Sequence, residues 1–161
     1  EILMVINNKH KYYILGISVL LYILALFNTL YVTDAQASAD IHIRYAYDVT
    51  CLNFFIGGII MIPYDIVFLL NGKVNFTLLW FSNITYFYIL SLWVKQRRMK
   101  TLFILVVLSI TMIISFYFCH DSIIGRDENI IYNIGDKGIG YYLWLISYFI
   151  ILFGILWYKE D

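Results

Sequence analysis

Four long runs of apolar residues contain no charged side chain, and they restrict the chain to one kind of fold. Each run has about the 20 residues that an α-helix needs to cross ~30 Å of hydrocarbon. The runs are Tyr12–Val32, Val74–Val94, Thr101–Cys119 and Ile139–Tyr158. We therefore predict an all-α integral membrane protein with a bundle of four transmembrane helices.

The composition supports this prediction. Hydrophobic residues make up 62% of the chain and charged residues 14%, whereas soluble domains contain about 45–50% apolar and about 25% charged residues. A soluble fold of this chain would have too few polar residues to cover its surface. Because 161 residues suffice for one domain but hardly for two, we predict a single transmembrane domain over residues 1–161.

The first apolar run is followed by two small-x-small sequences, Ala35-Gln36-Ala37 and Ala37-Ser38-Ala39, which are typical of a signal-peptidase site. The apolar core of a signal peptide has about 7–15 residues, and the run 12–32 is longer. We therefore expect this run to remain as a transmembrane helix. Removal of the segment after Ala39 is the alternative.

A fifth apolar run, Leu52–Leu70, is long enough to cross a membrane, but it contains Gly57-Gly58, Pro63 and Asp65. A carboxylate in the middle of a membrane costs a few kcal/mol on insertion scales. The run therefore has three interpretations, as a surface-lying segment, a re-entrant segment or a fifth span.

The distribution of basic residues predicts the orientation, because Lys and Arg beside membrane spans prefer the cytoplasmic side. With four spans and a cytoplasmic N-terminus, the inner basic residues are Lys9, Lys11, Lys95, Arg97, Arg98, Lys100 and Lys159, and the outer ones are Arg44, Lys73, Arg126 and Lys137. Five spans give nearly equal numbers on the two sides in either orientation. Four spans with both termini cytoplasmic therefore fit best.

This topology has two exterior regions, residues 33–73 and 120–138, and a cytoplasmic turn at residues 95–100. The frequent Ile, Asn, Lys, Tyr and Phe are typical of an AT-rich bacterial gene. We therefore expect a multi-pass protein of a bacterial inner membrane.

Both cysteines, Cys51 and Cys119, belong to the exterior side in this topology. Disulfides persist in such oxidising compartments, so a bond between them is a possible link between the two exterior regions if their Cα atoms come within ~7 Å. With His42 and His120 they are also the residue types that bind zinc. The chain has no Cys-x-x-Cys or His-x-x-x-His spacing, so we predict no metal site.

Small residues recur every seven positions along the last run, at Gly140, Ser147 and Gly154. A stripe of small residues lets the backbones of neighbouring membrane helices approach each other. We predict a packing face, which meets either the first run, where Gly16 and Ser18 lie, or a second copy in a homo-oligomer.

The cytoplasmic turn concentrates positive charge at Lys95, Arg97, Arg98 and Lys100. Such a cluster suits a cytosolic protein partner or anionic lipid head groups, and its simpler interpretation is a topology anchor. The formal net charge of the chain is zero, so its charge gives no indication of a nucleic-acid partner.

The residues favour a non-catalytic role. A thiol enzyme usually needs a reactive Cys-x-x-Cys pair, and a hydrolase needs a nucleophile beside a base; the sequence offers no such pattern, so we predict no catalytic residue and no cofactor. We expect a small membrane subunit that acts as a sensor, anchor or scaffold for a separate cytosolic partner. An envelope-stress or anti-phage defence module is a setting in which such subunits occur.

An oligomeric pore for small ions is the main alternative. Its lining would consist of Ser, Thr and Asn side chains, with the acidic exterior as a vestibule for cations. The four confident runs contain no ionisable residue of the kind that proton relays and ion-coupled transporters normally use. A membrane enzyme is the second alternative.

Overall fold

The computed structural model of the chain describes residues 8–37, 44–59, 75–95, 99–118, 122–124 and 130–157. These residues are mostly helical. The long helices are α1 (Asn8–Leu26), α3 (Asn75–Val94), α4 (Met99–Tyr117) and α5 (Ile139–Trp157), and residues 51–59 form a shorter helical segment. The strands are β1 (Thr29–Ala37), β2 (Arg44–Thr50), β3 (Ser122–Ile124) and β4 (Ile130–Lys137).

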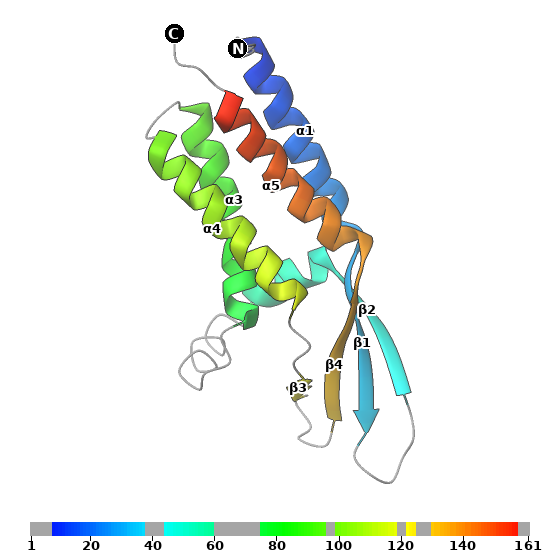
Figure 1. Ribbon diagram of the computed structural model, residues 1–161. Helices are drawn as coiled ribbons and strands as arrows, with labels where there is room; N and C mark the ends of the chain where they lie inside the picture. The colour runs from blue at the N-terminus through cyan, green and yellow to red at the C-terminus, as the bar shows by residue number, and fades with distance from the viewer. Residues whose placement is uncertain are drawn as a thin grey trace.

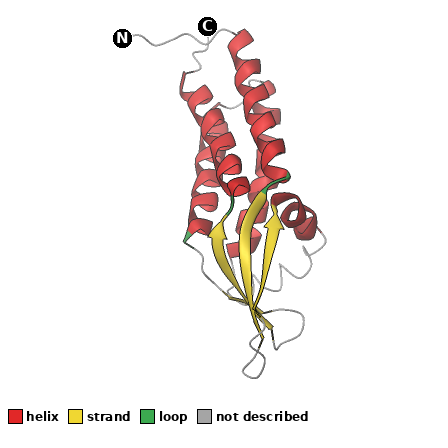
Figure 2. Cartoon of the chain, turned by 90° about the vertical axis from the view of Figure 1, so that its right-hand side faces the viewer, coloured by secondary structure: helices red, strands yellow, loops and turns green. Residues whose placement is uncertain are grey.

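The helices gather side by side, and the strands project from one end of them (Figure 1). Helix α1 packs on α5, α5 on α4, and α4 on α3. The centre of this bundle is filled by large buried side chains, among them Tyr86, Trp93, Trp144 and Tyr148. Figure 2 shows the same division into a helical part and a sheet from the side.

Helices α4 and α5 are long and apolar enough to cross a membrane. Along α4 the side chains at Leu102, Val106 and Ile113 are buried, while Ile104 and Leu108 on the other face are equally apolar and exposed. Only 33% of the apolar stretch of α4 and 44% of that of α5 is buried within the chain. Apolar helices whose outer faces stay uncovered require an apolar surrounding, so α4 and α5 indicate association with a membrane.

The predicted helix boundaries agree with the structure in three of four cases. Helices α3, α4 and α5 begin and end within two residues of the runs 74–94, 101–119 and 139–158.

The first helix differs from its prediction, because α1 begins at Asn8 and ends at Leu26, whereas the predicted helix extends from Tyr12 to Val32. The end of the apolar run belongs instead to β1. Aromatic and β-branched residues such as Tyr31 and Val32 favour strands, and here their backbone pairs with neighbouring strands.

The prediction of an all-α protein needs correction, since both regions that were predicted to be exterior, 33–73 and 120–138, contain strands. The four strands form one antiparallel sheet in the order β2-β1-β4-β3. In its central pair, Asp34 of β1 lies opposite Asn133 of β4. The sheet thus joins residues of region 33–73 to residues of region 120–138.

The described part of the fifth apolar run lies across the sheet-side end of the bundle (Figures 1 and 2). The carbonyl oxygen of Phe55 accepts a hydrogen bond of 3.0 Å from the indole N–H of Trp80 in α3. The rings of Phe54 and Trp144 in α5 are 6.4 Å apart. Residues 60–70 lie outside the described residues. The three interpretations of the run 52–70 therefore stay predictions.

Candidate functional site at the junction of sheet and bundle

Two strands of the sheet continue almost directly into two helices of the bundle. Helix α1 ends at Leu26 and β1 begins at Thr29, while β4 ends at Lys137 and α5 begins at Ile139. Strands β1 and β4 pair with each other, and α1 and α5 pack on each other. The two helix–strand units therefore run side by side through the sheet and the bundle (Figure 1).

Glycines make the closest approach at this junction possible. The N–H of Gly138 donates a 2.9 Å hydrogen bond to the carbonyl oxygen of Leu30, and a Cβ atom at Gly138 would collide with the carbonyl oxygen of Thr29. A Cβ atom at Gly140 would lie 2.7 Å from the carbonyl oxygen of Asn28. Any larger residue at these positions would push α5 away from the start of β1.

Cys51 brings a third segment into the same junction. Its N–H donates a 3.1 Å hydrogen bond to the carbonyl oxygen of Asn28, and its sulfur faces the position that a Gly140 Cβ would occupy, at 2.8 Å. Burial raises the pKa of the Cys51 thiol to about 12, which keeps the group neutral. A neutral buried thiol is a weak nucleophile.

The predicted disulfide between Cys51 and Cys119 is not resolved by these observations. Cys51 is a free, buried thiol in the structure, and Cys119 lies outside the described residues. The pairing therefore stays a prediction. His42 and His120 also lie outside the described residues, and within the described part of the chain no three His, Cys, Asp or Glu side chains cluster as metal ligands would.

Aromatic side chains join the end of α4 to the junction. The ring of Phe116 lies 5.7 Å from that of Tyr31 in β1 and 6.3 Å from that of Tyr141 in α5, measured between centroids. The ammonium of Lys137 lies 4.5 Å from the centroid of Phe116, and the Tyr141 hydroxyl donates to the carbonyl oxygen of Ile113 at 2.9 Å. Burial raises the pKa of Tyr31 to about 12, so its phenol also stays neutral.

The three small residues of α5 lie on its buried face, against other segments of the same chain. The hydroxyl of Ser18 in α1 donates a 2.9 Å hydrogen bond to the carbonyl oxygen of Ser147. A Cβ atom at Gly154 would meet the indole of Trp93 in α3 and, at 2.9 Å, the side chain of Ile14 in α1. Gly16, by contrast, is exposed, with nothing within 4 Å of its missing Cβ.

A buried polar layer crosses the bundle between α1 and α3. The hydroxyls of Ser18 and Tyr86 are 2.7 Å apart, and the Tyr22 hydroxyl donates to the side-chain oxygen of Asn83 at 2.8 Å. The rings of Tyr22 and Tyr86 stack, with centroids 4.1 Å apart. Because buried hydroxyls need hydrogen-bond partners, these bonds favour one arrangement of α1 against α3.

Two of the four residues of the predicted basic site can be placed. Lys95 follows α3 and Lys100 lies in the first turn of α4, and both are exposed at the end of the bundle far from the sheet. Arg97 and Arg98 lie outside the described residues. Sequence reasoning used Lys11 only for topology, yet the structure buries it beside this turn, with its ammonium donating to the carbonyl oxygen of Val94 at 3.2 Å.

No protein-family model, curated protein or solved structure matches this chain. The case for a function therefore rests on the geometry of the junction and on the distribution of charge.

Proposed function

We propose that this protein is a non-catalytic membrane subunit that receives a signal at its exterior sheet and passes it to a separate cytosolic partner. In this proposal the four long helices all cross the inner membrane of a bacterium, with both termini and the turn 95–100 in the cytoplasm. The partner binds at Lys95, Arg97, Arg98 and Lys100.

The observation that carries the proposal is the continuity between the sheet and the bundle. The paired strands β1 and β4 lead into the packed helices α1 and α5 through a junction where Gly138 and Gly140 leave no free space. A ligand that shifts the sheet must therefore also shift α1 and α5. Packed interfaces of this kind transmit small displacements because they have few alternative arrangements.

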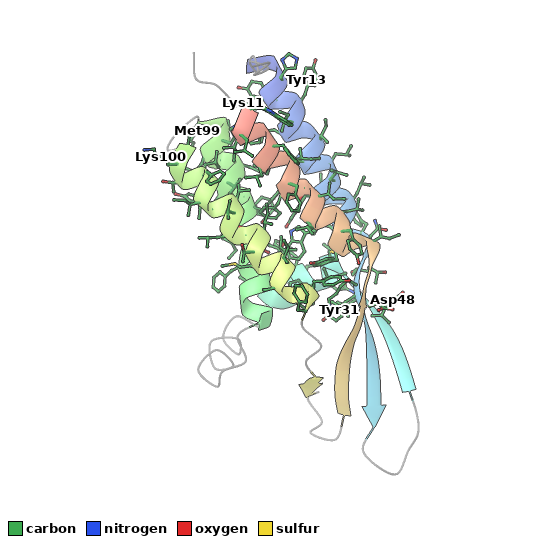
Figure 3. The ribbon with its side chains drawn as sticks, in the orientation of Figure 1. Lys11, Tyr13, Tyr31, Asp48, Met99 and Lys100 are labelled. Atoms are coloured by element: carbon green, nitrogen blue, oxygen red, sulfur yellow. The ribbon has the colours of Figure 1, made fainter. Side chains whose placement is uncertain are left out.

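The charge distribution supports the orientation. The described acidic residues, Asp34, Asp48 and Asp136, all lie in strands of the sheet. Lys11, Lys95 and Lys100 lie at the opposite end of the bundle, as Figure 3 shows for Lys11, Lys100 and Asp48. Because basic residues beside membrane helices prefer the cytoplasmic side, the sheet faces outward.

An oligomeric pore receives less support. Such a pore needs polar side chains on the outer surface of each protomer; Ser91, Thr111 and Ser115 are exposed, but Ser18, Asn83 and Ser109 are buried in the bundle. Ser18 and Asn83 are hydrogen-bonded to tyrosines of neighbouring helices, and the hydroxyl of Ser109 lies 2.8 Å from that of Thr85. These groups hold one protomer together and do not line a channel between copies.

Purification of the protein from its host in a mild detergent tests the proposal, with mass measurement of the intact complex. We expect a cytosolic chain in stoichiometric amount, and we expect it to be lost when Lys95, Arg97, Arg98 and Lys100 are all replaced by Gln. Replacement of Arg44 in β2 by Gln is the control and keeps the complex. A homo-oligomer that contains no second chain would contradict the proposal.

A further inference from the structure

Lys11 is a buried cation at the cytoplasmic end of the proposed bundle. It lies in the first turn of α1, and only 1% of its side chain is exposed. Its ammonium donates one hydrogen bond, 3.2 Å long, to the carbonyl oxygen of Val94 at the end of α3, and lies 5.6 Å from the centroid of the Tyr12 ring. An ammonium has three N–H donors, so this arrangement leaves donors unused.

The positive charge of Lys11 has no negative partner within the described part of the chain. The acidic residues described there, Asp34, Asp48 and Asp136, belong to strands at the other end of the molecule, and Figure 3 shows Lys11 and Asp48 at opposite ends. A carbonyl oxygen offers a dipole and no full charge. Since burying an unpaired charge is costly, the position of Lys11 calls for an anion beside it, which the described residues do not supply.

The surroundings of Lys11 indicate where that anion lies. Lys95 follows Val94 directly and Lys100 is the second residue of α4, and both are exposed. Tyr12 and Tyr13, which follow Lys11 in α1, are 60% and 69% exposed. Exposed tyrosines next to lysines at the end of a membrane helix are typical of head-group depth.

We propose that Lys11 binds the phosphate of an anionic phospholipid in the cytoplasmic leaflet, with Lys95 and Lys100 as further positive charges at the same end of the bundle. The inference rests on the membrane orientation given under the proposed function. The phosphate oxygens accept the free N–H donors of Lys11, and the two exposed lysines add attraction for the anionic surface. The lipid would thereby hold the ends of α1 and α3 together beside the partner-binding turn.

The test compares the wild-type protein with Lys11→Met, which keeps the length of the side chain and removes its charge. Each protein is purified in detergent and mixed with phosphatidylglycerol, phosphatidylcholine or inorganic phosphate. Lipid retention is measured by native mass spectrometry. Thermal stability is measured as the midpoint of unfolding. We expect the wild type to retain phosphatidylglycerol and to gain thermal stability from it, with little effect of phosphatidylcholine. Lys11→Met should bind phosphatidylglycerol about tenfold more weakly, and Arg44→Gln should bind it as the wild type does.

Equal affinity of the wild type and Lys11→Met for phosphatidylglycerol would overturn the inference, as would equal retention of phosphatidylcholine. An effect of inorganic phosphate as large as that of the lipid would show a site for free phosphate instead. If Lys11→Met does not fold, Lys11→Arg should retain the lipid and the double variant Lys95→Gln, Lys100→Gln should lose part of it; unchanged retention in that double variant contradicts the proposed site.

The outcome is separable from that of the proposed function. If Lys11→Met loses the cytosolic chain but retains the lipid as the wild type does, the Lys11 ammonium binds the protein partner. That result would overturn the lipid site. A protein that shows the lipid preference but purifies without any cytosolic chain would refute the proposed function and leave the lipid site standing.

Discussion

At the scale of single residues, Gly140 and Gly16 provide a matched pair of helical glycines. A methyl group at Gly140 would lie 2.8 Å from the sulfur of Cys51 and 2.7 Å from the carbonyl oxygen of Asn28, whereas at Gly16 it would meet nothing. We expect Gly140→Ala to lower the free energy of unfolding by about 1–3 kcal/mol, the usual cost of overpacking. Gly16→Ala should raise it by about 0.5–1 kcal/mol, because alanine is the better helix former.

Unfolding of both variants in a graded series of denaturing detergent measures this difference. A midpoint for Gly140→Ala equal to that of the wild type would mean that the junction is loosely packed, and the mechanical coupling proposed for it would then lose its basis.

Cys51 gives a second prediction at this scale. Its pKa is raised from 9.0 to about 12 in the folded protein, so folding favours the neutral thiol. The resulting stability is complete below pH 9 and is lost as the pH rises from 9 towards 12. Near neutral pH the thiol should resist a maleimide in the folded protein and react after unfolding.

Mass measurement of the maleimide adduct checks this in a chain where Cys119 is replaced by Ser, so that only Cys51 reports. Complete labelling of the folded protein near neutral pH would contradict the burial of Cys51 at the junction.

At the scale of secondary-structure elements, the sheet is the part that the sequence conceals. The helices α3, α4 and α5 were predictable, because a charge-free run of about 20 residues has few alternatives. The pairing of β1 with β4 joins residues about one hundred positions apart, such as Asp34 and Asn133, and local sequence carries no signal of it. Tyr31 and Val32 are residue types that favour a strand. They stand at the end of an apolar run that also fits a membrane helix, so the strand was not recognised.

The same limit applies to the candidate site. The spacing of Gly140, Ser147 and Gly154 suffices to predict a packing face, because it needs only the period of one helix. The burial of Lys11 depends on Val94, which lies 83 positions further along the chain. A count of basic residues beside the predicted spans therefore does not single out Lys11.

The strand pairing itself can be tested by a cysteine pair. Thr33 and Ile134 are direct partners in the register of β1 and β4, whereas Gln36 is the partner of Ile131. In the Cys119→Ser background, oxidation of Thr33→Cys with Ile134→Cys should form an internal disulfide, because directly opposite residues have their Cβ atoms about 4.5–5.5 Å apart. The pair Thr33→Cys with Ile131→Cys is offset in register and should form little.

Gel mobility without and with reductant reports the bond. Equal cross-linking of the two pairs would mean that the register is not fixed, and a sheet without a fixed register cannot move α1 and α5 as a unit.

At the scale of the whole molecule, the central question is which end faces the cytoplasm. The sheet carries Asp48 and Asp136, and both are exposed, while Lys95 and Lys100 are exposed at the other end. If all four long helices cross the membrane, these two pairs lie on opposite sides of it. The larger number of basic residues at the bundle end, Lys11, Lys95 and Lys100 against Arg44 and Lys137 in the sheet, then favours a cytoplasmic position for that end.

Labelling of single cysteines with a membrane-impermeant maleimide checks this arrangement. The cells are spheroplasts with an intact inner membrane, and Cys119 is again replaced by Ser. We expect Asp48→Cys and Asp136→Cys to be labelled at once, and Lys95→Cys and Lys100→Cys only after the membrane is permeabilised. Labelling of Lys100→Cys in intact cells would place the basic turn outside. That result would remove both the cytosolic partner site and the inner-leaflet lipid site, because each requires the lysines at that end of the bundle on the cytoplasmic surface.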